Sequence, residues 1–157
     1  MSHISIMATL TFPLAMLAAA WSDLRSFSIP NRLILILLAG YPPAALLNSL
    51  TAADWLSHLS AAMTLFAAGA GLFALGLWGG GDAKLLPMAG LWLGWQPLPR
   101  FLLVMSMTGG LLALLALALR AVPAGRRHFL AAGQIPYGVA IAAAGLDGWL
   151  AAILQRL

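Results

Sequence analysis

Long apolar runs, separated by short polar segments, make up almost the whole chain. The runs cover residues 4–21, 32–50, 55–78, 85–95, 101–119 and 135–154. A helix needs about 20 apolar residues to cross a bilayer, and five of the runs approach or exceed that length. The run at 85–95 is short for a crossing, so we expect a short helix sheltered by its neighbours. The pattern predicts an all-α polytopic membrane protein with about six transmembrane helices, in a single domain over 1–157.

The first run resembles a secretory signal peptide, because Ala18-Ala19-Ala20 could form a cleavage site. Its amino-terminal flank, however, has no Lys or Arg, and further apolar runs follow. We therefore interpret it as an uncleaved first helix.

Features inside the runs predict how the helices begin, break and pack. The Pro42-Pro43 pair should kink or break the second run. Thr51 or Asp54 can cap the third helix. Small residues at four-residue spacing predict close helix packing in the third and fifth runs. These small residues are Ala67 and Gly71, with Gly69 and Ala70 beside them, and the pair Ser106 and Gly110.

Composition supports a membrane protein and excludes several other classes. The chain is 62% hydrophobic and 8% charged, whereas a soluble domain carries about a quarter charged residues. There is no Cys and the three His residues are far apart, so we expect no disulfide, metal or cofactor. The basic residues stand between apolar runs, as topology signals do, so we expect contact with membrane lipid and not with nucleic acid.

The distribution of basic residues predicts which loops face the cytoplasm. Alternate loops carry Arg25, Arg32, Lys84, Arg120, Arg126 and Arg127 on one side, and Arg100 and Arg156 on the other. Because positive charge concentrates on the cytoplasmic side, the first set should lie inside and both termini outside. Asp23 and Asp82 then share the cytoplasmic face, and Asp54 lies on the opposite one.

The acidic residues are few, which makes each of them informative. The chain has no Glu and four Asp residues, at 23, 54, 82 and 147. Asp82 follows Gly79-Gly80-Gly81, and its location favours Asp23 as a partner. Two neighbouring carboxylates share a proton, so one can act as a base toward water while the other donates to a peptide carbonyl. Asp23 and Asp82 are therefore the candidate catalytic pair of an aspartic protease.

Simpler interpretations of these residues stay open at this point. Asp23 could pair with Arg25 or Arg32, and Asp82 could cap the fourth helix. Asp147, which lies between glycines, is either an intramembrane functional acid or the site of a helix break. Asp54 is more readily a cap than a ligand.

Four residues near the pair are candidates for contact with a substrate. Gly79 and Gly81 would let a substrate backbone approach closely. Lys84 is either an interfacial anchor or a group that tunes Asp82 or holds a substrate carbonyl. Tyr137 begins the last run on the same side of the membrane.

The order of these motifs resembles that of the type IV prepilin peptidases, which are membrane aspartic peptidases of the GxGD type. Three segments carry the resemblance: Asp23-Leu24-Arg25 with Ile29-Pro30-Asn31, then 79–84, then 135–141. The resemblance implies that Asp23 and Asp82 are catalytic and that no cofactor is needed. It also implies a substrate, a prepilin or pseudopilin precursor whose short leader is cut on the cytoplasmic side of the bacterial inner membrane.

One departure from the long members of that family carries an expectation of its own. Those members have an extra amino-terminal region with Cys pairs, and they also methylate the new terminus. This chain is similar to the short form of tight-adherence (Flp) pilus systems, so we expect peptidase but not N-methyltransferase activity. The alternatives are a GxGD intramembrane protease with other substrates and a proton-coupled carrier that uses the same aspartates. The oligomeric state cannot be predicted from the sequence.

Overall fold

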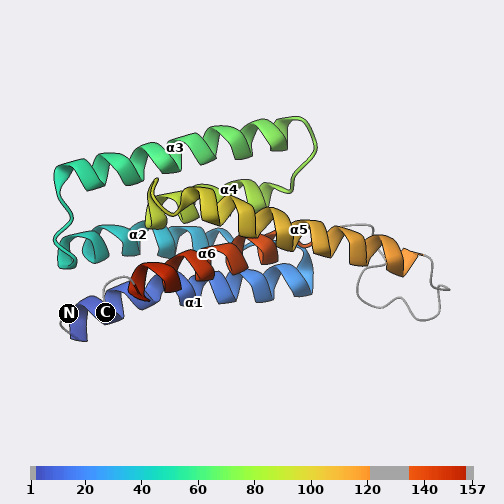
Figure 1. Ribbon diagram of the computed structural model, residues 1–157. Coiled ribbons are helices and arrows are strands. Elements are labelled where there is room, and N and C mark those ends of the chain that lie inside the picture. The colour runs from blue at the N-terminus through green and yellow to red at the C-terminus, as the bar shows by residue number, and fades with distance from the viewer. Residues whose placement is uncertain (1–2, 121–134, 155–157) are drawn as a thin grey trace.

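The computed structural model describes residues 3–120 and 135–154 of the chain, and this part folds into helices without strands. The helices are α1 (His3–Ser26), α2 (Asn31–Leu47), α3 (Ala52–Ala74), α4 (Gly80–Leu93), α5 (Leu98–Arg120) and α6 (Tyr137–Leu154). Their axes run side by side, and successive helices point in opposite directions (Figure 1). The all-helical arrangement predicted from the apolar runs is therefore confirmed.

The short helix α4 lies inside the bundle. It packs against α2, α3 and α6, and nine of its 14 residues are buried. The longer α3 has four buried residues among 23. The expectation of a short, sheltered fourth helix is thus confirmed, because its neighbours screen it from the surroundings.

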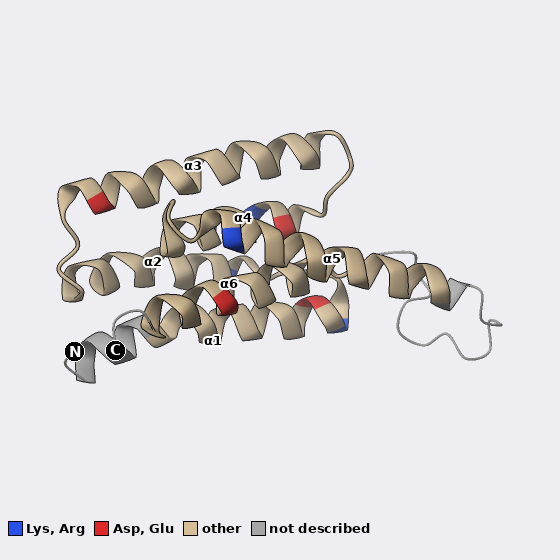
Figure 2. Ribbon diagram, in the orientation of Figure 1, with Lys and Arg blue, Asp and Glu red and all other residues tan. Residues whose placement is uncertain are grey.

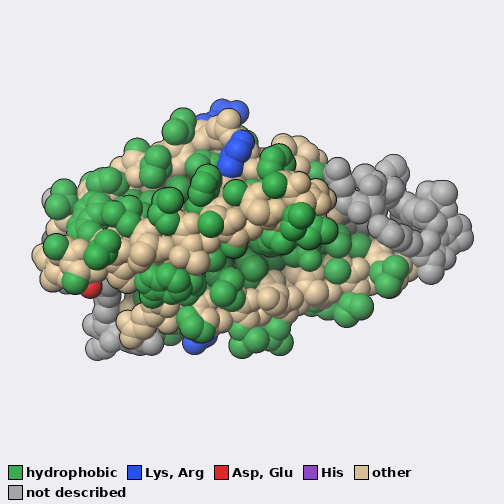
Figure 3. All heavy atoms as spheres, turned by 90° about the horizontal axis from the view of Figure 1, so that it is seen from above, with side chains coloured by type: hydrophobic (Ala, Val, Ile, Leu, Met, Phe, Trp, Pro, Cys, Tyr) green, Lys and Arg blue, Asp and Glu red, His purple; other side chains and the backbone are tan. Residues whose placement is uncertain are grey.

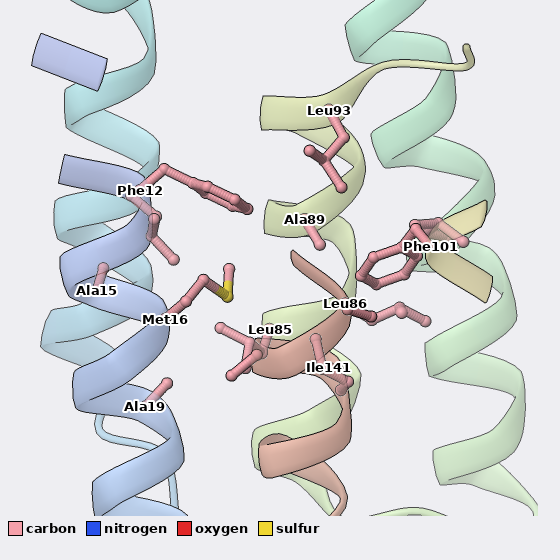
Figure 4. Packing of buried hydrophobic residues seen from close by; sticks show 14 of the residues in the cluster. Phe12, Ala15, Met16, Ala19, Leu85, Leu86, Ala89, Leu93, Phe101 and Ile141 are labelled. Carbon is pink, nitrogen blue, oxygen red and sulfur yellow. The ribbon is translucent and has the colours of Figure 1, made fainter. Parts of the chain in front are cut away.

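The core joins α1, α4, α5 and α6. Phe12 and Met16 of α1 point toward Leu85 of α4 and Ile141 of α6, and Phe101 of α5 lies on the other side of α4 (Figure 4). All five side chains are fully buried. The core therefore holds α4 against α1 and α6, the helices that contribute to the site described below.

The outer surface is apolar over most of its area. Leucines with more than half of their surface exposed occur on α1, α2, α3, α5 and α6, and hydrophobic side chains cover much of the face shown in Figure 3. Within the described residues, α3, Leu98–Ala118 of α5 and α6 are long and apolar enough to cross a membrane, and α2 is a shorter apolar helix. Such a surface suits lipid, since the helices satisfy their own backbone groups. The chain is a polytopic membrane protein.

Several local expectations were wrong. Helix α2 continues through Pro42 and Pro43, so the expected break is absent and the alternative of a kink stays a prediction. Membrane helices tolerate proline where neighbouring groups satisfy the freed backbone carbonyls. Helix α6 also continues past Asp147, since Gly145 packs on Phe12 and Gly148 packs on Leu93. These glycines allow close packing and do not break the helix.

The close helix contacts involve neighbours of the predicted small residues. Gly69 lies against the backbone of Ala83, where an added Cβ would stand 3.1 Å from the carbonyl oxygen, whereas nothing lies within 4 Å of Gly71. On α5, Gly109 contacts Tyr137, but Gly110 is open. The small residues were recognised correctly, but their spacing did not identify the face that packs.

Candidate active site

Two carboxylates lie buried at the same end of the bundle. Asp23 is 4% exposed and Asp82 is 9% exposed, and they are the buried charged residues of the described chain. Figure 2 shows acidic positions of α1 and α4 at the end where α1 leads into α2 and α3 leads into α4. The structure therefore brings together the two residues that the sequence singled out.

Both carboxylates stand on helix ends, which the sequence analysis had placed in loops. Helix α1 continues to Ser26, so Asp23 lies in its last turns. Helix α4 begins at Gly80, so Asp82 lies in its first turn. Asp23 follows the apolar run 4–21 and Asp82 precedes the run 85–95. Each is thus held by regular backbone just outside an apolar run.

The connector between α1 and α2 is shaped by local hydrogen bonds. Ser22 Oγ donates to the Ser28 carbonyl at 2.8 Å, and the Phe27 N–H donates to the Asp23 carbonyl at 2.9 Å. Phe27 itself has a φ of 49°, a left-handed conformation that reverses the chain direction. The turn directs Ile29 back into the bundle, where it is buried.

Ile29 packs against two glycines from different helices. A Cβ at Gly81 of α4 would stand 3.2 Å from the Ile29 Cβ, and a Cβ at Gly138 of α6 would stand 2.9 Å from the Ile29 Cδ1. A Cβ at Gly138 would also lie 2.7 Å from Oδ2 of Asp23. A side chain at either position would therefore force its neighbours to shift, the Asp23 and Ile29 side chains at 138 and Ile29 at 81, and glycine avoids this.

Asp82 has an unusual affinity for its proton. Burial raises the pKa of Asp82 from its ordinary value to about 7, and the negative charge of Asp23 raises this pKa as well. Its Oδ2 turns back toward Gly79, where an added Cβ would be 3.2 Å away. Near neutral pH this carboxyl group can therefore hold a proton while it is close enough to Asp23 to interact with it.

Asp23 lies in a different electrostatic environment. Burial raises the pKa of Asp23, while the nearby backbone of Gly138 and Val139 lowers it. Its Oδ2 is buried and has no hydrogen-bond partner in the described chain. The pair therefore combines a carboxyl group that favours its proton with a carboxylate whose charge is partly stabilised. Such an arrangement suits general acid–base chemistry.

The structure also decides between the simpler interpretations. Arg25 stacks on the Trp21 ring at 4.1 Å, and the salt bridge found among the described residues joins Arg100 and Asp147. Pairing of Asp23 with Arg25 or Arg32 is thus not observed there. The cap of α4 is Gly79, without a side-chain hydrogen bond, so the interpretation of Asp82 as a cap was wrong.

The other two aspartates have structural partners. Asp54 and Thr51 form a capping box at the start of α3, which confirms the prediction of a cap. Asp147 accepts two hydrogen bonds from Arg100, at 2.7 and 2.9 Å. This pairing holds α6 against the start of α5. The basic residues at 126, 127 and 156, which entered the topology prediction, lie outside the described residues.

The candidate substrate contacts are spread around the pair. Gly79 is exposed, but the space beside Gly81 is filled by Ile29. Lys84 is exposed and donates from Nζ to Oδ1 of Asn31 at 3.1 Å. It therefore joins α4 to the start of α2, a contact that the sequence did not predict.

Tyr137 makes an aromatic contact with the residue that precedes Gly79. Its ring lies 5.7 Å from the ring of Trp78, and it fits against the bare backbone of Gly109. Sequence reasoning missed Trp78, Ile29 and Gly138 as parts of the site. Ile29 and Gly138 belong to segments that carry the family resemblance, and Trp78 directly precedes the glycines before Asp82, but no pattern indicated their contacts.

A second group of polar residues lies at the opposite end of the bundle. A cavity of about 640 Å³ is lined there by the ends of α2, α4 and α6 and by the start of α3, and it includes Tyr41, Asp54 and His58. Its aspartate, Asp54, is exposed, so the cavity contains no buried carboxylate. No group of three metal-ligand side chains occurs among the described residues.

The fold is that of a polytopic membrane protein with a buried pair of carboxyl groups at one end of its helices. A family model for the type IV leader peptidase family matches residues 10–114, which include both aspartates. The chain belongs to this family. The resemblance noted in the sequence is therefore confirmed.

One curated relative gives a partial match. The chain is 41% identical over 73 residues to a prepilin leader peptidase/N-methyltransferase of Pseudomonas aeruginosa. The match covers 46% of this chain and 22% of the relative, so the chain spans about a fifth of that protein. No solved structure matches the chain significantly.

Proposed function

We propose that this protein is a membrane aspartic endopeptidase that removes the short leader from prepilin or pseudopilin precursors. The observation that carries the proposal is the buried pair of Asp23 and Asp82 within the part of the chain that matches a leader peptidase family. The proposed setting is the bacterial inner membrane, with the aspartate end of the bundle at the cytoplasm. The excess of basic residues on the corresponding loops supports this orientation.

The proposed reaction uses one ionised and one protonated carboxyl group. The ionised group takes a proton from water as the water oxygen bonds to the carbonyl carbon, and the protonated group gives its proton to the carbonyl oxygen. When the tetrahedral intermediate collapses, the C–N bond breaks and the first group returns its proton to the leaving amine. The second group recovers its proton from the intermediate, so the pair regains its starting state.

The residues around the pair have separate proposed roles. Gly79 is exposed and adjoins Asp82, so a substrate backbone can approach there. Gly81 serves the packing of α4 on Ile29. Lys84 and Tyr137 are proposed to contact the substrate at the edges of the site. Lys84 is held by a hydrogen bond to Asn31, and Tyr137 by the contact of its ring with Trp78.

The name of the relative joins a peptidase with an N-methyltransferase. The carboxylate pair supports the hydrolytic activity, so we propose only that one for this chain. A carrier function is less well supported, because Asp147, the acid farthest along its apolar run, is engaged by Arg100.

The proposal predicts that each carboxyl group of the pair is essential. Asp23→Asn and Asp82→Asn, tested separately in membranes, should each reduce cleavage of a pilin-like precursor by about a thousandfold or more, because acid–base groups supply factors of this size. The control is Asp54→Asn, since Asn caps a helix as well as Asp does. Cleavage at the normal rate by either pair variant would sink the proposal.

A further inference from the structure

The cavity at the end of the bundle opposite the carboxylate pair has a volume of about 640 Å³, which is within the range of sites for small ligands. Its lining includes the aromatic side chains of Tyr41, Trp92, Trp95 and Trp149. Aromatic residues gather at membrane surfaces as anchors, but an anchor requires neither a cavity nor a polar group without a partner. The polar groups of the lining therefore show what the cavity can hold.

Hydrogen bonds hold two of the indole side chains in place. The indole N–H of Trp92 donates to the carbonyl of Leu37 on α2 at 3.0 Å, and that of Trp95 donates to Oγ of Ser60 on α3 at 2.8 Å. Each bond joins the end of α4, or the turn that follows it, to another helix. The cavity is therefore formed in advance, so a ligand that enters it has little of the lining to order.

His58 places a hydrogen-bond acceptor in the lining. Its Nδ1 lies 2.8 Å from the Leu91 carbonyl oxygen. That oxygen can only accept, so Nδ1 carries the hydrogen and Nε2 of the neutral ring is an acceptor. Gly94 also lines the cavity, and an added Cβ there would stand 2.9 Å from Nε2. Glycine at 94 thus keeps the acceptor edge of His58 clear of a side chain.

Tyr41 adds a hydroxyl group that the described chain leaves unsatisfied. The residue is 4% exposed, and its hydroxyl oxygen has no hydrogen-bond partner among the described residues. The rings of Trp55 and Trp92 contact the Tyr41 ring at centroid distances of 5.2 and 5.8 Å, which fixes its position. A buried polar group without a partner costs free energy. A ligand with a polar group at this position would remove that cost.

The lining carries one charge of each sign. Asp54 accepts two hydrogen bonds from Thr51 and has no salt bridge within the described chain. It lies four residues before His58, so the two share a face of α3, and their acceptors together suit a primary ammonium group. Arg100 is exposed and uses Nε and Nη2 for Asp147, which leaves three of its five N–H donors for an anion such as phosphate. The lining therefore matches a zwitterion.

The surface beside the cavity indicates that the zwitterion is part of a lipid. The ends of α2 and α6 both contribute to the lining, and these ends carry exposed leucines on their outer sides. The leucines are Leu46, Leu47, Leu150 and Leu154. Acyl chains can lie along such a surface while their headgroup occupies the cavity.

We infer that this cavity binds the headgroup of a phospholipid of the phosphatidylethanolamine type. The ammonium group is held by Asp54 and His58, the phosphate by Arg100, and the hydroxyl of Tyr41 completes its hydrogen bonding with the headgroup. The inference does not rest on the proposed peptidase function, because it concerns the other end of the bundle and is measured without a precursor.

The test compares three lipids with the same acyl chains, whose apparent Kd values for the full chain in detergent are measured by native mass spectrometry. Phosphatidylcholine has no ammonium N–H and phosphatidylglycerol has no ammonium group. Phosphatidylethanolamine should therefore bind about tenfold more tightly than either, since hydrogen bonds to charged groups have effects of this size. Equal affinities for the three lipids would overturn the inference.

Soluble phosphoethanolamine separates a lipid from a free zwitterion of the same chemistry. Without acyl chains it should bind about a hundredfold more weakly or less, because each buried methylene group adds affinity. If it binds as tightly as the lipid, the ligand is a free zwitterion and the inference is wrong.

Asp54→Asn tests the ammonium contact, because Asn keeps the cap of α3 but removes the negative charge. It should weaken the binding of phosphatidylethanolamine about tenfold and bring it close to that of phosphatidylglycerol. The matched control is Asp82→Asn, which removes a carboxyl group at the other end of the bundle and should bind the lipid normally. An unchanged affinity in Asp54→Asn, or the same loss in both variants, would contradict the inference.

Tyr41→Phe tests the hydroxyl group while it keeps the ring packing. It should weaken binding of the lipid about fivefold, the effect of one hydrogen bond. Thermal unfolding of the lipid-free variant should be unchanged, because the hydroxyl has no protein partner to lose. Tyr137→Phe, at the carboxylate end, is the control and should bind the lipid normally. Normal binding by Tyr41→Phe would show that the headgroup does not reach the hydroxyl, and the assigned position would be wrong.

Discussion

Asp82 keeps a carboxyl group beneath the first turn of α4, where water solvates its charge poorly. Its pKa lies at about 7, against an ordinary value of 3.8. The folded protein therefore binds this proton more tightly than the unfolded chain does. The resulting stabilisation is complete below about pH 4 and is lost as the pH rises through about 7.

This linkage predicts a pH-dependent effect of Asp82→Asn. Above pH 7 the variant should be more stable than the natural protein by a few kcal/mol, since each pH unit between the two pKa values is worth about 1.4 kcal/mol. Near pH 4 the two proteins should have nearly the same stability. Thermal unfolding in detergent at both pH values measures the difference. A gain of equal size at both would show that the buried charge is not its cause.

At the residue scale, the sequence identified the pair because acids are rare in an apolar chain. Asp23 and Asp82 could be selected from four candidates by charge and loop alternation alone. Ile29 and Gly138 could not be selected in this way, because their role arises from contacts between α4, α6 and the α1–α2 connector. Such contacts depend on how helices are placed and not on local pattern.

At the scale of the elements, the position of the site depends on how closely the neighbouring helices pack against α4. Gly69 of α3 meets the backbone of Ala83, one residue after Asp82, and an added Cβ would also stand 3.3 Å from the Ala83 Cα. A backbone neighbour cannot move aside as the end of a flexible side chain can. The glycine therefore fixes the distance between α3 and the start of α4.

A pair of substitutions on α3 tests this contact. Gly69→Leu should destabilise the protein by about 1–3 kcal/mol, as overpacking does in well-packed cores, and should also reduce cleavage because it displaces Asp82. Gly71→Leu, two residues away, has no atom within 4 Å of its Cβ position and should change neither stability nor cleavage. Equal melting temperatures for the two variants would contradict the packing described here.

The sequence predicted the number and order of these elements but misplaced their ends. Polar residues at 22–26 were assigned to a loop, although they continue α1 as helix. Pro42 and Pro43 were expected to kink or break α2, which continues through them as helix. Membrane helices tolerate proline where neighbouring groups satisfy the freed backbone carbonyls. Helix ends and breaks depend on the surroundings of the residues, which a hydropathy pattern does not describe.

At the scale of the whole molecule, the two ends of the bundle carry different chemistry. One end holds the carboxylate pair and the exposed residues Arg25, Arg32 and Lys84. The other end holds the cavity lined by Tyr41 and His58. Alternating loops predicted this separation, because a chain that crosses a membrane repeatedly must return every second loop to the same side.

The proposed orientation can be tested with single cysteines, since the natural chain contains none. Ser26→Cys lies at the aspartate end and Gln96→Cys at the other, and both positions are exposed. A thiol reagent that cannot cross membranes should label Gln96→Cys in intact cells. It should label Ser26→Cys only after the inner membrane has been opened. The reverse pattern would place the carboxylates outside the cytoplasm and contradict the proposed topology.

The packing of Ile29 links three positions that are distant in the sequence. Because one side chain fills the space beside both Gly81 and Gly138, a change at any of the three alters what the other two can tolerate. A smaller residue at 29 would open room for a methyl group at 81. The loss of the Ile29 side chain would also loosen the packing of the first turn of α6 near Asp23. The energetic effects of substitutions here are therefore not additive. In the divergence of such a protein, these three residues would have to change together.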